Sequence, residues 1–136
     1  MFRVWDKKTK YLDYDVRITS IDNYRKIKKI EVLDGFTDWR EIKENDYILM
    51  RNTYLKDKHG NEIYEGDILK TRTHGLVKVK VENGNMVVTY KSGVNSRTTL
   101  TLSSFLDRYQ VNIVGNIYEN LELIDEVEEW EKTYFL

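Results

Sequence analysis

The chain has 136 residues, 40% of them hydrophobic, which is enough for one ordinary domain or two very small ones with a core. Lys and Arg number 22 against 23 Asp and Glu, and this balance argues against a generally basic nucleic-acid binder. The lack of cysteine excludes disulfides, thiolate zinc sites and a cysteine nucleophile. No apolar run reaches the roughly 18 residues of a membrane span, and no signal peptide is evident, so a cytoplasmic location is expected.

Alternation of apolar and polar residues predicts short strands in the first part of the chain. A period of two places successive side chains on opposite faces, which is typical of a strand with one face in water. A short helical turn is expected over residues 38–43, where the pattern is mixed. The expected strands cover residues 2–5, 11–12, 15–19, 30–32 and 47–50.

A polar loop over residues 55–62 is followed by a second series of strands. Val77, Val79 and Val81 alternate with lysines and form the clearest strand of the chain. Asn83-Gly84 then predicts a tight hairpin, because both turn residues tolerate positive φ. One helical turn is expected over residues 103–108. The remaining expected strands cover residues 68–71, 86–90, 99–102 and 111–117.

The chain changes character at residue 119. Residues 119–136 hold seven acidic residues and one basic residue, a net charge of -6, whereas residues 1–118 hold 21 basic and 16 acidic residues, a net charge of +5. The apolar side chains of this segment are spaced by one, three, three and four residues, which predicts one face of a helix. The expected assembly contact consists of Leu123, Ile124, Val127, Trp130 and Tyr134.

Together these elements predict a mainly β fold, made of two small β-rich subdomains and a C-terminal helix. The expected subdomains are residues 1–54 and residues 55–118, the second resembling an SH3-like barrel, and the acidic amphipathic helix is residues 119–136. Each subdomain is near the size at which a hydrophobic core alone gives marginal stability. We therefore expect the subdomains to pack on each other or on neighbouring chains, with a homo-oligomer as the first expected partner and no membrane contact.

The central loop carries acidic residues and glycines that we interpret as structural. A calcium loop needs an acidic ligand at its twelfth position, and the residue in that position counted from Asp57 is Ile68. The alternative is an enzyme with a carboxylate site near Asp67, where Glu62 and Glu65 would assist in acid–base work or bind magnesium. The predicted structural loop comprises Asp57, Gly60, Glu65, Gly66 and Asp67.

No residue forms a recognisable catalytic pattern. His59 and His74 each precede a glycine in a turn, and we expect both rings to face solvent rather than to act as general bases. No glycine-rich loop opens a helix, so a phosphate cradle of the familiar kinds is not predicted. We predict no catalytic residue, no metal and no cofactor, and we favour a binding protein over an enzyme.

Two basic clusters leave nucleic acid as an alternative partner. A basic face with interleaved aromatic residues is typical of single-strand binders, and Tyr24 lies beside the denser cluster. The competing interpretation is a solvated sheet face whose lysines prevent aggregation at the edge, and the small net charge favours it. The possible nucleic-acid contacts are Arg25, Lys26, Lys28, Lys29, Lys78 and Lys80.

Three blocks of sequence resemble a known family. They are FRVWDKKTKYL at residues 2–12, LKDKHGNEIYEGDIL at residues 55–69 and VNIVGNIYENLELI at residues 111–124. All three resemble the YopX family of phage and prophage proteins, although His59 stands where the family usually has Asn, and Leu121 where many members have Pro. The resemblance implies a protein of phage or prophage genomes in Gram-positive bacteria, with no established activity and no catalytic residue to transfer. We therefore expect a non-enzymatic accessory protein that acts by binding and self-assembles.

Overall fold

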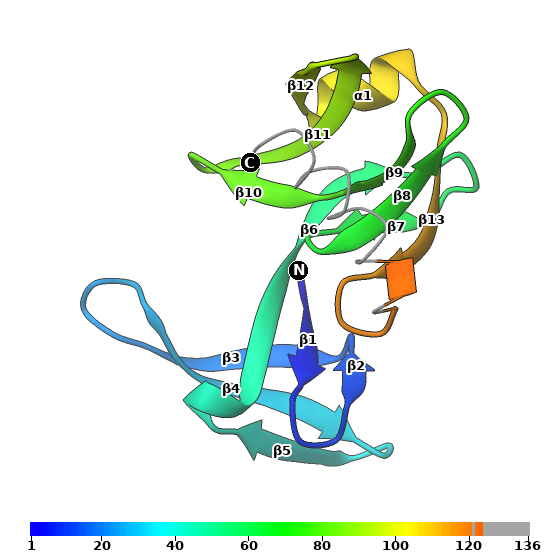
Figure 1. The fold of residues 1–136 in the computed structure, drawn as a ribbon. Coiled ribbons are helices and arrows are strands. Elements are labelled where there is room, and N and C mark those ends of the chain that lie inside the picture. Colours follow the sequence, from blue (N-terminus) through cyan, green and yellow to red (C-terminus); the bar gives the residue numbers. More distant parts are fainter. Residues whose placement is uncertain (121, 124–136) are drawn as a thin grey trace. The chain divides into compact units, whose positions relative to one another are not determined.

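The computed structural model describes residues 1–120, 122 and 123, and 60% of this part is strand (Figure 1). The predicted mainly β fold class is confirmed. The chain divides into two compact units, Met1–Arg51 and a second unit that begins at Asn52. Among the described residues, no helix is long and apolar enough to cross a membrane.

The first unit contains two antiparallel arrangements of strands. In one, β1 pairs with β2 on one side and with the first half of β6 on the other. In the second, β4 lies between β3 and β5. The strands are β1 (Phe2–Asp6), β2 (Tyr11–Asp13), β3 (Val16–Ile21), β4 (Ile27–Asp34), β5 (Asp38–Ile42) and β6 (Tyr47–Lys56).

The core of the first unit follows from the alternation in its strands. Val4 of β1 meets Ile30, Val32 and Ile42 of the three-stranded sheet, and all four side chains are buried. Residues 30 and 32 are two apart and so lie on the same face of β4. The expected helical turn over residues 38–43 is wrong. This segment is the strand β5, because pairing with β4 buries Ile42, and a single 3-10 turn (Glu44–Asp46) follows it.

The second unit is a half-barrel with one short helix. Its strands form the three-stranded sheets β13-β8-β9 and β10-β11-β12, while the end of β6 pairs with β7. Only Val79 separates β9 from β10, so the chain passes directly from one sheet into the other. The elements are β7 (Glu62–Tyr64), β8 (Asp67–Thr71), β9 (Gly75–Lys78), β10 (Lys80–Glu82), β11 (Asn85–Gly93), β12 (Ser96–Thr101), α1 (Leu102–Arg108) and β13 (Val111–Asn116).

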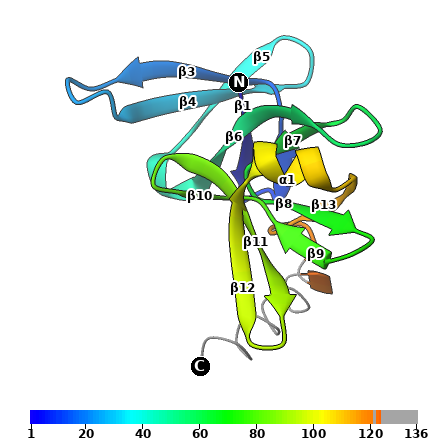
Figure 2. The same ribbon diagram turned by 90° about the horizontal axis from the view of Figure 1, so that it is seen from above.

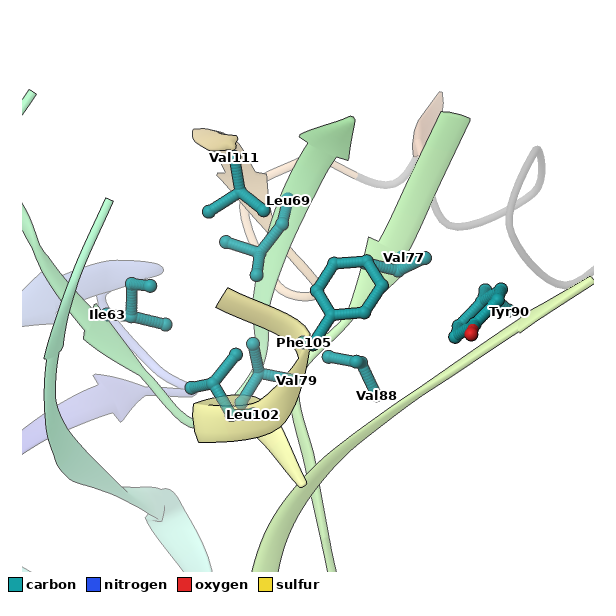
Figure 3. Packing of buried hydrophobic residues seen from close by; sticks show 9 residues of the cluster. All are labelled: Ile63, Leu69, Val77, Val79, Val88, Tyr90, Leu102, Phe105 and Val111. Carbon is teal, nitrogen blue, oxygen red and sulfur yellow. The ribbon is translucent and has the colours of Figure 1, made fainter. Parts of the chain in front are cut away.

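The helix α1 closes the core of the half-barrel. It follows β12 directly (Figure 2), and its N-cap Thr101 accepts a hydrogen bond from the backbone N–H of Ser104 (3.2 Å). Leu102 and Phe105 point from the helix into the core and are fully buried. Figure 3 shows these side chains among those of both sheets. The cluster comprises Ile63, Leu69, Val77, Val79, Val88, Tyr90, Leu102, Phe105 and Val111.

The predicted C-terminal helix falls almost entirely outside the described residues. Leu123 is described, and its backbone N–H donates to the carbonyl oxygen of Asn120 (3.0 Å). The other members of the predicted apolar face, Ile124, Val127, Trp130 and Tyr134, lie outside the described part of the chain. The helix over residues 119–136 therefore stays a prediction.

Candidate functional site

The first unit carries a surface hollow of about 570 Å³. This volume is within the range of roughly 300–1,000 Å³ found for ligand pockets. Segments far apart in the sequence form its wall: β2 with the residues on either side of it, the turn between β4 and β5, and one side chain of β5. The residues that line it are Thr9, Tyr11, Leu12, Asp13, Tyr14, Asp15, Leu33, Asp34, Gly35 and Arg40.

Arg40 is fixed in the wall of the hollow by two carboxylates. Its Nη2 donates to Oδ2 of Asp6 (3.1 Å) and its Nε donates to Oδ2 of Asp34 (3.1 Å). Burial would lower the pKa of Arg40, but these two acidic partners outweigh burial and raise it. The guanidinium is therefore already paired with two carboxylates.

Asp6 is the buried partner of Arg40. Its side chain is 1% exposed, and Oδ1 accepts hydrogen bonds from the backbone N–H groups of Lys8 (2.9 Å) and Thr9 (3.2 Å). Burial alone would raise the pKa of Asp6, but the hydrogen bonds from Thr9, Lys8 and Arg40 hold it below its usual value. Asp6 is thus a satisfied, ionised carboxylate that braces the β1–β2 turn.

Asp13, in the same hollow, has the opposite electrostatic environment. Its Oδ2 is buried and has no hydrogen-bond partner among the described residues. Burial raises the pKa of Asp13 more than the positive charge of Arg40 lowers it, and the negative charges of Asp6, Asp34 and Asp15 add to the rise. The hollow therefore has more acidic charge than its own cation compensates.

Two exposed aromatic residues line this acidic hollow, and a third follows one of its lining residues in the sequence. Tyr11 and Tyr14 line it and are 64% and 53% exposed, and Phe36, which follows the lining residue Gly35, is 99% exposed. Exposed apolar groups that gather in one place mark interaction surfaces more often than isolated ones do. We did not identify this site from the sequence. The signal that would have indicated it is the mixed aromatic and acidic segment YLDYD at residues 11–15.

In the central loop, Asp57 is a buried acceptor of hydrogen bonds. Oδ1 accepts from the backbone N–H groups of His59 (2.9 Å) and Asn61 (2.9 Å), and Oδ2 accepts from that of Ile113 (3.2 Å). Burial would raise the pKa of Asp57, but these hydrogen bonds lower it. Gly60 lies in the same turn with φ of 82°.

The turn between β7 and β8 holds the remaining residues of the predicted loop. Oδ2 of Asp67 accepts a hydrogen bond from the backbone N–H of Tyr64 (2.8 Å), and Asp67 is 1% exposed. Gly66 has φ of 88°, a conformation that favours glycine, and Glu65 beside it is half-buried. Glu62, in contrast, is exposed and accepts a hydrogen bond from Nδ2 of Asn52 (3.0 Å).

The predicted nucleic-acid contacts are interleaved with acidic partners. In the first unit Lys26 lies 3.6 Å from Glu44, Lys28 lies 3.9 Å from Asp22, and Lys29 lies 3.8 Å from Glu41, each distance joining a nitrogen to a carboxylate oxygen. In the second unit Lys80 lies 3.5 Å from Glu82, and Lys78 is half-buried at the end of β9. Among the described residues, Arg25 has no ion-pair partner.

The expectation that His74 faces solvent is wrong. Its ring lies 4.2 Å from that of Tyr90 and 4.7 Å from that of Tyr109, and both distances join ring centroids. Nε2 of His74 is buried and has no hydrogen-bond partner within the described part of the chain. A hydrogen bond with Tyr90 raises the pKa of Tyr109, and burial adds to this effect. The turn before Gly75 folds back onto the core, which a local pattern does not reveal.

Of the predicted assembly contact, only Leu123 is described. It lines a second hollow of about 260 Å³ together with Leu76 and Val114, on the sheet β13-β8-β9. Within the described residues, no group of three or more His, Asp or Glu side chains is arranged to hold a metal ion.

The described residues thus define a small two-unit β protein, with an acidic, aromatic-rimmed hollow in one unit and a half-barrel in the other. The chain belongs to the YopX family, since a family model described as YopX protein matches residues 1–125. It is similar to protein EF1440 from Enterococcus faecalis, whose crystal structure has 27% sequence identity and a TM-score of 0.61, covering 90% of this chain and 95% of that one. No curated protein matches the chain.

Proposed function

We propose that this protein is a non-enzymatic binding protein and that the hollow of its first unit holds a basic side chain of a protein partner. The observation that carries the proposal is Asp13, whose buried Oδ2 lacks a donor among the described residues. A buried acceptor without a partner costs roughly 1–3 kcal/mol, and such a cost is retained where the group has a functional use. In keeping with its family, we place the protein among phage and prophage accessory proteins of the bacterial cytoplasm.

The charge of the hollow favours a cationic ligand. Arg40 is shared between Asp6 and Asp34, which leaves Asp13 and Asp15 without a cation of their own in the wall. A lysine or arginine side chain would bring the missing donors together with the compensating charge. Hydrogen bonds between ionised partners are about twice as strong as neutral ones.

The aromatic rim favours a protein over a free small molecule. Tyr11 and Tyr14 offer ring faces on which an arginine can stack or a peptide can pack. Tyrosine is enriched in the centre of protein interfaces, where it contributes large area at low entropic cost. A nucleic acid would present phosphates to this acidic surface and would be repelled.

The nucleic-acid and enzyme alternatives receive less support. Three lysines of the Arg25–Lys29 run already face acidic partners, so the run offers no continuous positive stripe. Asp67 is 1% exposed and braces a turn, whereas Glu62 is at the surface, so these carboxylates do not face one open cleft. Binding is thus the better supported function.

The experiment is a titration of the ¹⁵N-labelled full chain with N-acetyl-arginine methylamide, followed by NMR. We expect saturable shifts in the backbone signals of residues 11–15 and 34–35, and a loss of these shifts in Asp13→Asn. N-acetyl-citrulline methylamide, which has the same shape without the charge, is the matched ligand control. Asp107→Asn in α1 is the matched protein control. Shifts that are absent, or that persist unchanged in Asp13→Asn, would contradict the proposal.

A further inference from the structure

The turn between β3 and β4 presents an aromatic and a cationic side chain to solvent. Tyr24 is 93% exposed, and Arg25 has a positive φ of 62°. Asp22 fixes this turn, since its Oδ1 accepts hydrogen bonds from the backbone N–H groups of Tyr24 (2.9 Å) and Lys26 (2.8 Å). The exposed ring is therefore carried by an ordered turn, which reduces the entropy lost when it binds. We call residues 22–26 the hairpin tip.

Arg25 is the uncompensated cation of the basic run. Lys26 and Lys28 pair with Glu44 and Asp22, while Arg25 has no such partner among the described residues. Tyrosine and arginine are the residue types that most often carry the binding energy of protein interfaces. The hairpin tip thus supplies what the acidic hollow lacks, a guanidinium without an acidic partner, and carries an exposed aromatic ring beside it.

The hairpin tip cannot reach the hollow of its own chain. The ladder between β3 and β4 runs from the pair Val16–Val32, next to the hollow, to the pair Ile21–Ile27, next to the tip. Six residues of strand at about 3.3 Å each separate the two ends by roughly 20 Å. In Figure 1 the β3–β4 turn and the β4–β5 turn likewise lie at opposite ends of the three-stranded sheet.

We propose that the hairpin tip of one copy of this chain docks in the hollow of a second copy. The guanidinium of Arg25 then pairs with the acidic wall of the hollow at Asp13 and Asp15, and Tyr24 packs against the rim formed by Tyr11 and Tyr14. This inference rests on the proposed function and names its partner. Because the two surfaces are different and lie at opposite ends of one hairpin, the contact is heterologous and joins copies head to tail. Such a contact closes into a ring or grows into a filament.

The same contact predicts a specific response to salt. Exposed opposite charges attract over about 8–10 Å at physiological ionic strength and over less at higher salt. Assembly through the tip and the hollow is therefore expected to weaken as sodium chloride is added. Assembly through a purely apolar surface would be unchanged or strengthened.

The test uses two variants of the full chain and their mixture in sedimentation velocity. Arg25→Glu disrupts binding by the hairpin tip and leaves the hollow intact, whereas Asp13→Lys disrupts binding by the hollow and leaves the hairpin tip intact. We expect the wild-type mass to rise with concentration, and each variant alone to self-associate at least about tenfold more weakly. In an equimolar mixture each pair of variants has one functional contact between tip and hollow, so the mass is expected to rise above that of either variant alone and to stay below that of wild type. Arg108→Glu in α1 is the matched control and is expected to behave as wild type.

The outcomes separate this inference from the function on which it rests. A wild-type chain that is monomeric at high micromolar concentration but still binds N-acetyl-arginine methylamide overturns the docking of a second copy and leaves the proposed function standing. A chain that neither assembles nor binds the amide contradicts both. Assembly that Arg25→Glu leaves intact also overturns the inference. If circular dichroism shows that Asp13→Lys is unfolded, Asp13→Asn replaces it in the mixture.

Discussion

The carboxylate of Asp57 accepts a hydrogen bond from the backbone N–H of Ile113, 56 residues further along the chain (3.2 Å). A second long-range hydrogen bond, from the backbone N–H of Lys58 to the carbonyl oxygen of Val111 (3.0 Å), joins the same two segments. Two of the blocks that carry the family resemblance, residues 55–69 and 111–124, are therefore held together at one point. The acidic residue of the central loop connects the loop to β13.

Replacement of Asp57 by alanine is expected to destabilise the protein. Four donors point to this buried carboxylate, three of them backbone N–H groups, and alanine would leave them without an acceptor. The expected loss in the free energy of unfolding is roughly 1–3 kcal/mol. Urea denaturation followed by circular dichroism measures it, with the exposed Asp107→Ala as the matched control. An unchanged unfolding midpoint for Asp57→Ala would show that the loop does not depend on this brace.

The pH dependence of stability is expected to reflect Asp6 and Asp57. Both have a pKa lowered in the folded state by hydrogen bonds that outweigh burial. Each therefore contributes stability above the unfolded pKa near 3.8, and this contribution is lost as pH falls through the lower folded value. The free energy of unfolding measured with urea should be lower at pH 3 than at pH 7. Asp6→Asn is expected to flatten this pH dependence, and a profile as steep as that of wild type would contradict the assignment.

The ionisation of Asp13 is expected to change the stability of the protein with pH in the opposite direction. Burial and neighbouring acids raise its pKa, so the folded state disfavours the ionised form and gains stability as this group is protonated. Asp13→Asn should therefore be at least as stable as wild type at pH 7, whereas Asp6→Asn should be less stable. A binding residue that costs stability fits the usual conflict between stability and function. Loss of stability in Asp13→Asn at pH 7 would instead indicate a structural brace.

The strand pattern could be predicted from the sequence because it depends on neighbours along the chain. Val77 and Val79 alternate with lysines and are buried, and Asn83-Gly84 forms the expected turn between β10 and β11. The error over residues 38–43 has a non-local cause. Trp39 stands opposite Leu33 and Ile42 opposite Ile30, and this pairing with β4 makes the segment a strand.

The role of Gly115, in the third block that resembles the family, is also explained only by the structure. A Cβ atom at this position would clash with Oδ1 of Asn120, which accepts a hydrogen bond from the backbone N–H of Asn116 (3.1 Å). Oδ1 of Asn116 in turn accepts from the backbone N–H groups of Tyr118 and Glu119 (both 2.9 Å). The glycine and the two asparagines are thus parts of one turn, which the amino-acid sequence alone does not reveal.

The hollow could not be predicted, since its wall comes from segments that meet only in the folded chain. Asp6, Asp13, Asp34 and Arg40 are spread over 35 residues of sequence, and no local spacing relates them. Pairing of the basic run with acids was missed for the same reason. Lys26 pairs with Glu44 of the 3-10 turn, and Lys29 of β4 pairs with Glu41 of β5, so both ion pairs form only in the folded chain.

The wild-type protein is expected to show no salt-dependent retention on a single-stranded DNA column. The lysines of the basic run are paired with carboxylates, and binding through phosphates would require a surplus of cations on one surface. The comparison is Lys28→Glu with Lys29→Glu. Retention of the wild type that falls steeply with salt, and that this double variant loses, would restore nucleic acid as the partner.

The predicted apolar face of residues 123–136 offers a second surface for assembly. Leu123 already lines a hollow with Leu76 and Val114, and an isolated helix of this length is marginal in water, so the face must be buried somewhere. The acidic segment is attracted to basic surfaces in either its own chain or a neighbour. We expect Val127→Asp with Trp130→Ala to lower the mass of the oligomer while the circular dichroism of the sheets stays largely intact.

Light scattering on this double variant separates the two locations of the apolar face. The matched control is Glu128→Gln with Glu129→Gln, which alters the same segment without changing its apolar residues. If the face packs between chains, the mass of the oligomer falls in the apolar variant and is unchanged in the control. If the face packs within its own chain, the apolar variant keeps the mass of wild type and has a lower unfolding midpoint, because the sheet loses its apolar cover. A wild-type chain that is already monomeric at micromolar concentration would make the assembly prediction wrong, and the segment would then be an intramolecular lid.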